Sequence, residues 1–188
     1  MKESVKNWGR NFLSPLTNLL IKLKITADCL TIASLPTSML AGYFIAYRKW
    51  LLAIISIIIV ALFDTLDGEI ARKTGTIHKK GAFLDSVLDR IAEFFIFLGF
   101  FLYYYPNKLL SSLVFCTIFT SMLVSYIRAR AEGIGQDCKI GIFERPIRFI
   151  VIILGLIILR YPYFHYALLV ILIGNIITIF QRVFYVLR

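Results

Sequence analysis

Six long apolar stretches, separated by short polar segments, constrain the fold of this chain more than any other feature of its sequence. Each stretch approaches the roughly 20 residues that an α-helix needs to cross a bilayer core about 30 Å thick. Of the 188 residues, 59% are hydrophobic and 17% are charged, which is far from the composition of a soluble globular protein. We therefore predict an all-α integral membrane protein that forms a single domain over residues 1–188.

We expect an N-terminal amphipathic helix at the membrane interface, followed by six transmembrane helices. Residues 1–24 place Trp8, Leu16 and other apolar side chains at helical spacing between basic residues, which is typical of an interfacial helix rather than of a disordered tail. Pro15 is expected either to break this helix or to lie in the first turn of its second half. The six spans are expected at about residues 27–47, 50–73, 81–105, 107–127, 144–160 and 166–186.

The distribution of charge predicts how these spans are oriented. With a cytoplasmic N-terminus, the 21 Lys and Arg residues fall on the cytoplasmic side, except for Arg48, Lys49, Lys108 and Arg160. All 11 acidic residues fall on that side too. The positive-inside rule therefore predicts that both termini and the chemistry face the cytoplasm of a multi-pass cell-membrane protein. The net charge of +10 fits anionic lipid headgroups and phosphate ligands better than nucleic acid, because the basic residues are divided among loops that flank the spans.

Four carboxylates within residues 64–89 are the strongest sign of chemistry in the chain. Asp64 and Asp67 are three residues apart in the second expected span. Asp85 and Asp89 are four apart in the third, so the members of each pair share a helix face. A charge inside a span costs roughly 2.5–3.5 kcal/mol, and converging carboxylates repel one another unless cations lie between them. We expect all four to bind Mg²⁺ or Mn²⁺, as two ions that could clamp both sides of a phosphoryl transfer.

Three alternatives compete with an enzymatic metal site. Ion pairing with Arg72 and Arg90 would be purely structural, but two arginines cannot neutralise four carboxylates, and Glu93 extends the acidic face by another turn. A divalent cation transporter would also use acids inside spans. The acids all lie on one side, however, and neither helix has a break in mid-span. A membrane scaffold without chemistry would tolerate loss of Asp89.

Residues 64–89 read Asp64-x2-Asp67-Gly68-x2-Ala71-Arg72-x8-Gly81-x3-Asp85-x3-Asp89. This pattern resembles, at all eight fixed positions, the signature of the CDP-alcohol phosphatidyltransferases. The resemblance implies a homodimeric membrane enzyme that transfers a phosphate-linked lipid from a CDP-activated donor to an alcohol and releases CMP. It also implies that Asp89 completes the metal site and acts as the general base on the acceptor hydroxyl, which requires a carboxylate near the reacting phosphorus.

The same resemblance assigns a set of residues to the CDP-lipid. Residues 26–31, TADCLT, resemble the TPNxLT element of the family, with Ala27 in place of Pro and Asp28 in place of Asn. Helix capping by Thr26 is the structural alternative for this segment. His78, in the polar turn between the two motif helices, is expected to be a solvated loop residue. The residues expected to bind the CDP-lipid are Asp28, Thr31, Gly68, Ala71, Arg72 and Gly81.

A second basic group is expected to hold the phosphate of an anionic acceptor. It consists of Arg128, Arg130, Lys139, Arg145 and Arg148. The segments SYIRARAEGIG and GIFERPIR resemble those of the phosphatidylinositol phosphate and archaetidylinositol phosphate synthases, which implies inositol 1-phosphate as acceptor and CDP-diacylglycerol or CDP-archaeol as donor. A phosphatidylglycerophosphate synthase using glycerol 3-phosphate is the nearest alternative. Membrane topology and contact with bulk anionic lipid could also account for these basic residues.

Overall fold

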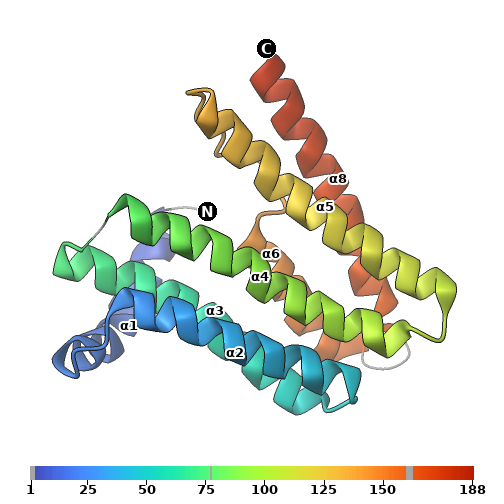
Figure 1. Cartoon of the computed structure of the whole chain (residues 1–188), viewed down its shortest axis with the longest axis horizontal. Coiled ribbons are helices and arrows are strands. Elements are labelled where there is room, and N and C mark those ends of the chain that lie inside the picture. The colour runs from blue at the N-terminus through green and yellow to red at the C-terminus, as the bar shows by residue number, and fades with distance from the viewer. Residues whose placement is uncertain (1–2, 77, 160–162) are drawn as a thin grey trace.

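The computed structural model describes residues 3–76, 78–159 and 163–188, and within them it contains helices and no strand (Figure 1). The side chains are described from residue 13 onward. The helices are α1 (Glu3–Lys22), α2 (Ala27–Ala46), α3 (Trp50–Thr74), α4 (Lys79–Tyr104), α5 (Lys108–Gly133), α6 (Arg145–Leu154), the π-helical η1 (Gly155–Leu159) and α8 (His165–Leu187).

Four of these helices, α2, α3, α5 and α8, are long and apolar enough to cross a membrane. Helix α4 has 26 residues, but its first half carries several charged side chains. The fifth expected span divides into the ten residues of α6 and the five of η1. The all-helical fold is thus confirmed, whereas the six-span count and the orientation stay predictions. Arg160, counted above on the non-cytoplasmic side, lies outside the described residues.

The predicted boundaries of the first, second, third and sixth spans differ from the observed helices by at most two residues. Thr26 caps α2 as expected, because its Oγ1 accepts a hydrogen bond from the Cys29 N–H at 3.3 Å. Helix α5 instead continues six residues beyond the expected end, to Gly133. Charged residues end an apolar stretch, but they are good helix formers and do not interrupt the backbone hydrogen bonds.

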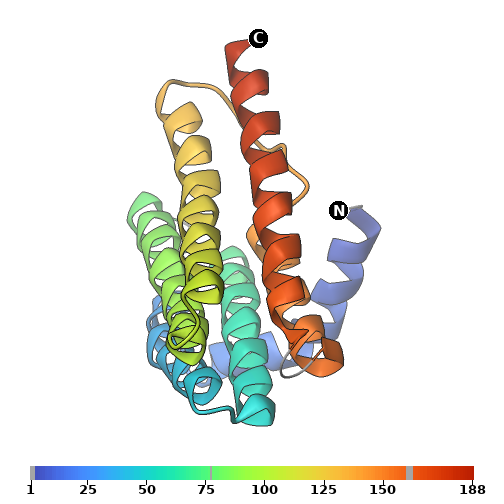
Figure 2. The same ribbon diagram turned by 90° about the vertical axis from the view of Figure 1, so that its right-hand side faces the viewer.

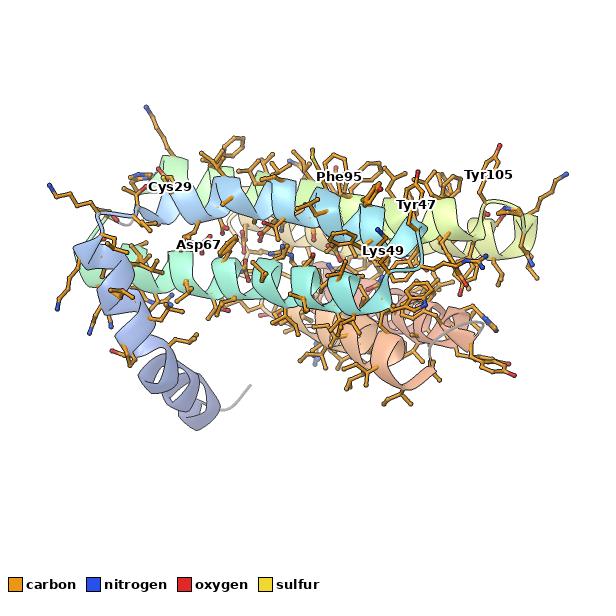
Figure 3. The ribbon with its side chains drawn as sticks, turned by 90° about the horizontal axis from the view of Figure 1, so that it is seen from below. Cys29, Tyr47, Lys49, Asp67, Phe95 and Tyr105 are labelled. Carbon is orange, nitrogen blue, oxygen red and sulfur yellow. The ribbon has the colours of Figure 1, made fainter. Side chains whose placement is uncertain are left out.

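Helix α1 is continuous through Pro15, so of the two alternatives expected for this proline the break is absent. The helix leaves the bundle at an angle near the start of α2 (Figure 3). Its second half is fastened to α3 by Lys73, whose Nζ donates to Ser14 Oγ at 2.9 Å and to Asn18 Oδ1 at 3.0 Å. Apolar residues of this half also pack on a small buried cluster formed by Leu30, Leu66 and Ile70.

Two sets of helices build the bundle. Helix α2 packs along both α3 and α4, whereas α5 packs along α8, and these two run side by side in Figure 2. The α2–α4 crossing is close because it is made by Gly42 and Gly99: a Cβ on either glycine would collide with backbone atoms of the opposite helix. The two sets meet at a buried aromatic contact, where the rings of Phe100 and Phe164 stack at 4.2 Å.

The two ends of the α2–α4 layer differ in chemistry. Figure 3 places Asp67 and Cys29 toward one end, and Tyr47, Lys49 and Tyr105 at the other. The aromatic end has the residues typical of a membrane interface. The opposite end holds the four carboxylates of residues 64–89, so the chemistry of the molecule is concentrated there.

Candidate active site

Three of the four predicted metal ligands converge in space. The last turns of α3 supply Asp64, and the first half of α4 supplies Asp85 and Asp89. One carboxylate oxygen from each lies within 4.8 Å of the others. Asp85 Oδ1 is buried and has no hydrogen-bond partner among the described residues, which is unusual for a buried carboxylate. Oxygen ligands at this spacing, one of them unpartnered, fit a hard divalent cation.

Asp67, the fourth predicted ligand, lies beside this group rather than within the set that converges. It is buried, and its Oδ2 accepts a hydrogen bond from Thr31 Oγ1 at 2.8 Å. Thr31 is itself buried on α2, so one side of the Asp67 carboxylate is oriented by a neighbouring helix. Asp67 also forms part of the wall of the cavity described below.

Arg145, at the start of α6, reaches the carboxylate group from a distant part of the chain. Its NH1 lies 2.9 Å from Asp64 Oδ1 and 2.5 Å from Asp89 Oδ2. Its Nε and NH2 atoms are buried without a hydrogen-bond partner among the described residues, and the guanidinium lies 4.9 Å from the ring centroid of Phe149. A guanidinium between two carboxylates neutralises part of their repulsion and fixes their spacing.

Ion pairing with the acids therefore occurs, but with a different arginine from those considered on sequence. Arg72 pairs with Glu69 on its own helix at 2.9 Å, and Arg90 donates to the carbonyl of Ser86 at 2.5 Å. Neither is hydrogen-bonded to one of the four aspartates. Arg145 is separated from Asp64 by 81 residues, so local sequence spacing gave no sign of this contact.

A cavity of about 650 Å³ opens beside the carboxylates. Its wall combines the end of α1, the start of α2, the end of α3 and the start of α4. Asp67 and Asp85 lie on this wall, so the cavity and the carboxylate group share residues. All of the residues predicted to bind the CDP-lipid line it: Asp28, Thr31, Gly68, Ala71, Arg72 and Gly81.

His78 has a clearer structural function than the solvated loop expected from sequence. Its Nδ1 accepts a hydrogen bond from the Gly81 N–H at 2.6 Å and so caps α4. The ring also lines the cavity. A Cβ on Gly81 would lie 2.6 Å from the imidazole and 3.6 Å from Asp28 Oδ1, so glycine is needed where the cap, α2 and the cavity wall approach one another.

The predicted acceptor group is only partly brought together. Arg145 lies against the carboxylates, and Arg148 is buried behind it, where Nε and NH2 bind the two carboxylate oxygens of Glu93 at 2.6 and 2.9 Å. The other three lie at the surface of α5 and the loop after it. Of these, Arg128 pairs with Glu132 at 2.8 Å and Lys139 pairs with Asp137 at 2.7 Å, while Arg130 is exposed. Acceptor binding by these residues stays a prediction.

Arg182, one of the basic residues expected on the cytoplasmic side, organises the approach to α6. Its side chain is buried on α8 and donates from Nε to the Ile140 carbonyl at 2.8 Å and from NH1 to the Val124 carbonyl at 2.6 Å. Thr178, one turn earlier, accepts the Phe143 N–H at 3.0 Å. An arginine inside an apolar span costs free energy on insertion. The presence of Arg182 near the end of the sixth expected span could therefore have indicated a buried contact.

The fold and the site define a class: a helical membrane protein in which carboxylates suited to a divalent metal adjoin a cavity large enough for a nucleotide. The chain belongs to the CDP-alcohol phosphatidyltransferase family, whose model matches residues 24–185. It is therefore an enzyme of this family, with the membrane location that the family has.

Similar proteins point to one branch of the family. The phosphatidylinositol phosphate synthase of Mycobacteroides abscessus is 31% identical over 181 residues, which cover 90% of this chain and 80% of the relative. The archaetidylinositol phosphate synthase of Methanothermobacter thermautotrophicus is 30% identical over 180 residues, covering 94% and 89%.

Solved structures show the same similarity. The phosphatidylinositol phosphate synthase of Mycobacterium tuberculosis with CDP-DAG bound superimposes with a TM-score of 0.83 at 27% identity, covering 94% of each chain. The structure of the same enzyme in complex with manganese and citrate gives a TM-score of 0.83 at 27% identity, covering 92% of this chain and 87% of the other.

Proposed function

We propose that this enzyme transfers a phosphatidyl or archaetidyl group from CDP-diacylglycerol or CDP-archaeol to inositol 1-phosphate, with release of CMP. One observation carries the proposal: all of the residues expected at the CDP-lipid line one cavity, and that cavity shares Asp67 and Asp85 with the carboxylate group. The names of the relatives, phosphatidylinositol phosphate and archaetidylinositol phosphate synthase, support the choice of acceptor.

The carboxylates Asp64, Asp67, Asp85 and Asp89 would hold Mg²⁺ or Mn²⁺, as two ions per site. When bound, these ions supply positive charge that offsets the charge of the diphosphate and of the departing CMP. The manganese in the related M. tuberculosis structure supports a divalent metal of this kind. Among the described residues, Asp85 Oδ1 is a buried carboxylate oxygen without a hydrogen-bond partner, as expected of an atom that binds a metal ion.

Asp89 would act as the general base. Its carboxylate takes the proton of the acceptor hydroxyl while the hydroxyl oxygen forms a bond to the lipid-bearing phosphorus. The bond between that phosphorus and the bridging oxygen breaks, and CMP leaves with the electron pair. Arg145 holds Asp89 and Asp64 in place through the contacts described above.

Arg145 would also bind the acceptor phosphate, together with Arg128, Arg130, Lys139 and Arg148. Arg145 is the member of this group that the structure places at the carboxylates, and a buried guanidinium with two unpartnered nitrogens can donate to phosphate. The buried pair of Arg148 with Glu93 places a second guanidinium behind it. The three surface residues would need their loop to approach α6 in order to contribute.

We further infer that residues 1–188 form one membrane domain and that the enzyme is a homodimer in the cell membrane with its site facing the cytoplasm. Exposed apolar side chains on α5, including Phe115, Phe119 and Met122, provide a surface for lipid or for a second subunit. Single cysteines at residues 48 and 108 should lie on the opposite side of the membrane from single cysteines at residues 24 and 139. Labelling them from one side would test the orientation. Cross-linking in membranes would test the dimer.

A direct assay tests the reaction. Purified enzyme is supplied with CDP-diacylglycerol or CDP-archaeol, each with inositol 1-phosphate, glycerol 3-phosphate or serine, and CMP release is measured. The proposal predicts turnover with inositol 1-phosphate, loss of turnover with a chelator, and recovery with Mg²⁺ or Mn²⁺. Preference for glycerol 3-phosphate would contradict the acceptor assignment, and metal flux without CMP release would favour a transporter.

A further inference from the structure

Helices α1 and α2 both end in a backbone conformation that normally requires glycine. Lys24 follows α1 with φ 58°, and Arg48 follows α2 with φ 60°, whereas α3 ends at Gly75 with φ 68°. Within the described part of the chain, these two are the non-glycine residues at positive φ. A residue with a Cβ is sterically disfavoured in the left-handed region. A long side chain at such a position therefore points to a contact that the side chain makes, either within the protein or with a ligand.

The end of α1 has the hydrogen bonds of a Schellman motif. The Lys24 N–H donates to the Ile21 carbonyl at 2.9 Å, and the Ile25 N–H donates to the Leu20 carbonyl at 3.0 Å. These bonds place Lys24 at the position of the motif where glycine is usually found. The backbone is fixed there because Lys73 fastens the second half of α1 to α3.

The end of α2 has the same motif and therefore provides an internal comparison. The Arg48 N–H donates to the Ile45 carbonyl at 3.0 Å, and the Lys49 N–H donates to the Phe44 carbonyl at 2.8 Å. The Arg48 side chain has a visible use, because its guanidinium carbon lies 5.5 Å from the ring centroid of Tyr103. This contact lies at the aromatic end of the bundle, far from the carboxylates.

The Lys24 side chain makes no comparable contact with the residues that the structure describes. Its ammonium makes no hydrogen bond or ion pair within the part of the chain that the structure describes. The residue instead lines the cavity beside the carboxylates. Of the described Lys and Arg residues on the cavity wall, the other is Arg72, which is already paired with Glu69 at 2.9 Å. Lys24 is thus the cation of this wall that has no partner among the described residues, so it can bind an anionic ligand in addition to Arg72.

We infer that Lys24 binds a phosphate oxygen of the nucleotide-linked lipid at the mouth of the cavity. The inference rests on the proposed function, since it requires a CDP-lipid as the donor. A lysine ammonium suits this purpose because it is a compact charge on a flexible stem that can follow the diphosphate as it enters. The rigid end of α1 holds the base of that stem at the cavity wall, and the unfavourable backbone conformation is the cost of placing it there.

The test uses Lys24→Gly, because glycine removes the ammonium and at the same time relieves the backbone. The full-length variant should melt at the same temperature as the wild type or higher. We expect its KM for the CDP-lipid to rise about five- to tenfold with kcat within about twofold, since an interaction with the bound donor is lost. Lys24→Arg should keep the KM within about twofold of the wild type.

Arg48→Gly is the matched control, because it relieves the same conformation at the end of the bundle away from the cavity. It should leave the KM for the CDP-lipid unchanged. Inhibition by free CDP, which carries no lipid, identifies the source of the phosphate: Lys24→Gly should weaken CDP inhibition by the same factor as it raises KM. If CDP inhibition were unchanged and the KM defect appeared only in vesicles containing anionic lipid, Lys24 would be a headgroup contact and the inference would be wrong.

An unchanged KM in Lys24→Gly would also overturn the inference. Failure of the proposed function would look different, because the wild-type enzyme would then release no CMP from either CDP-lipid with inositol 1-phosphate. The two failures are therefore distinguishable in one set of assays.

Discussion

Glu93 and Arg148 form a bidentate ion pair in the interior of the protein, with Arg148 Nε and NH2 2.6 and 2.9 Å from the two carboxylate oxygens. Their side chains are 6% and 1% exposed, so neither charge is solvated. The pair joins α4, which carries Asp85 and Asp89, to α6, which carries Arg145. It therefore sets the distance between the carboxylates and the arginine that reaches them.

The first prediction concerns this pair. Glu93→Gln or Arg148→Ala should each destabilise the folded state by about 3–5 kcal/mol, because the remaining charge is left buried without a partner. The double variant Glu93→Leu/Arg148→Met should recover much of that loss. Melting temperatures in detergent would measure these changes in stability. Asp137→Asn is the control: it breaks an exposed ion pair and should cost less than about 1 kcal/mol. A double variant as unstable as the sum of the single variants would contradict the prediction.

The second prediction concerns Asp89 as general base. Asp89→Asn should lower kcat for CMP release by at least about 10²–10⁴-fold, because an amide cannot accept the hydroxyl proton. The melting temperature should change little, since the amide is nearly the same size and can still accept a hydrogen bond from Arg145. Lys108→Ala, at the exposed start of α5, serves as a control with unchanged turnover. A wild-type kcat in Asp89→Asn would show that Asp89 is not the general base.

The third prediction concerns the hydrogen bond from Thr31 to Asp67. Thr31→Val keeps the shape of the side chain but removes the donor 2.8 Å from Asp67 Oδ2. Loss of an outer hydrogen bond to a metal ligand typically lowers metal affinity about 10–100-fold, so the Mg²⁺ or Mn²⁺ concentration that gives half-maximal activity should rise accordingly. Thr31→Ser should restore it. An unchanged metal requirement would show that Asp67 is oriented by other contacts.

The fourth prediction separates the two substrates. Arg145→Ala should raise the KM for inositol 1-phosphate far more than the KM for the CDP-lipid, by roughly tenfold or more, if its guanidinium binds the acceptor phosphate. Because Arg145 also contacts Asp64 and Asp89, the metal dependence must be measured in the same variant. Equal changes in both KM values would show that Arg145 only organises the carboxylates.

Much of the helix pattern could be predicted because it depends on local properties. Apolar length predicted where most of the helices run, and the capping preference of Thr26 marked the start of α2. The predicted CDP-lipid residues of the cavity could also be found, because they lie in residues 26–31 and 64–89, the two segments that resemble motifs of the family. Their resemblance to a family signature then supplied the chemistry.

The contacts of α6 could not be predicted, because they join residues far apart in the chain. Arg145 is 81 residues from Asp64, and Arg148 is 55 residues from Glu93. Spacing along one helix says nothing about which distant arginine will enter an acidic group, and a basic cluster in the sequence gives no indication that some members are buried and others exposed. The left-handed conformation of Lys24 could not be predicted either, because the rules for helix ends expect glycine at that position.

The contact between Gly42 and Gly99 bears on how the lipid donor of the proposed reaction would reach the cavity. Both glycines lie toward the aromatic end of α2 and α4, and their backbones touch. The two helices cannot slide past each other there without losing this contact. A change in the angle between α2 and α4 would therefore pivot about it. Small changes of angle at this point would move the opposite ends of α2 and α4, where Thr31 and Asp85 line the cavity, apart or together. Widening the entrance would then need no rearrangement in the middle of the membrane.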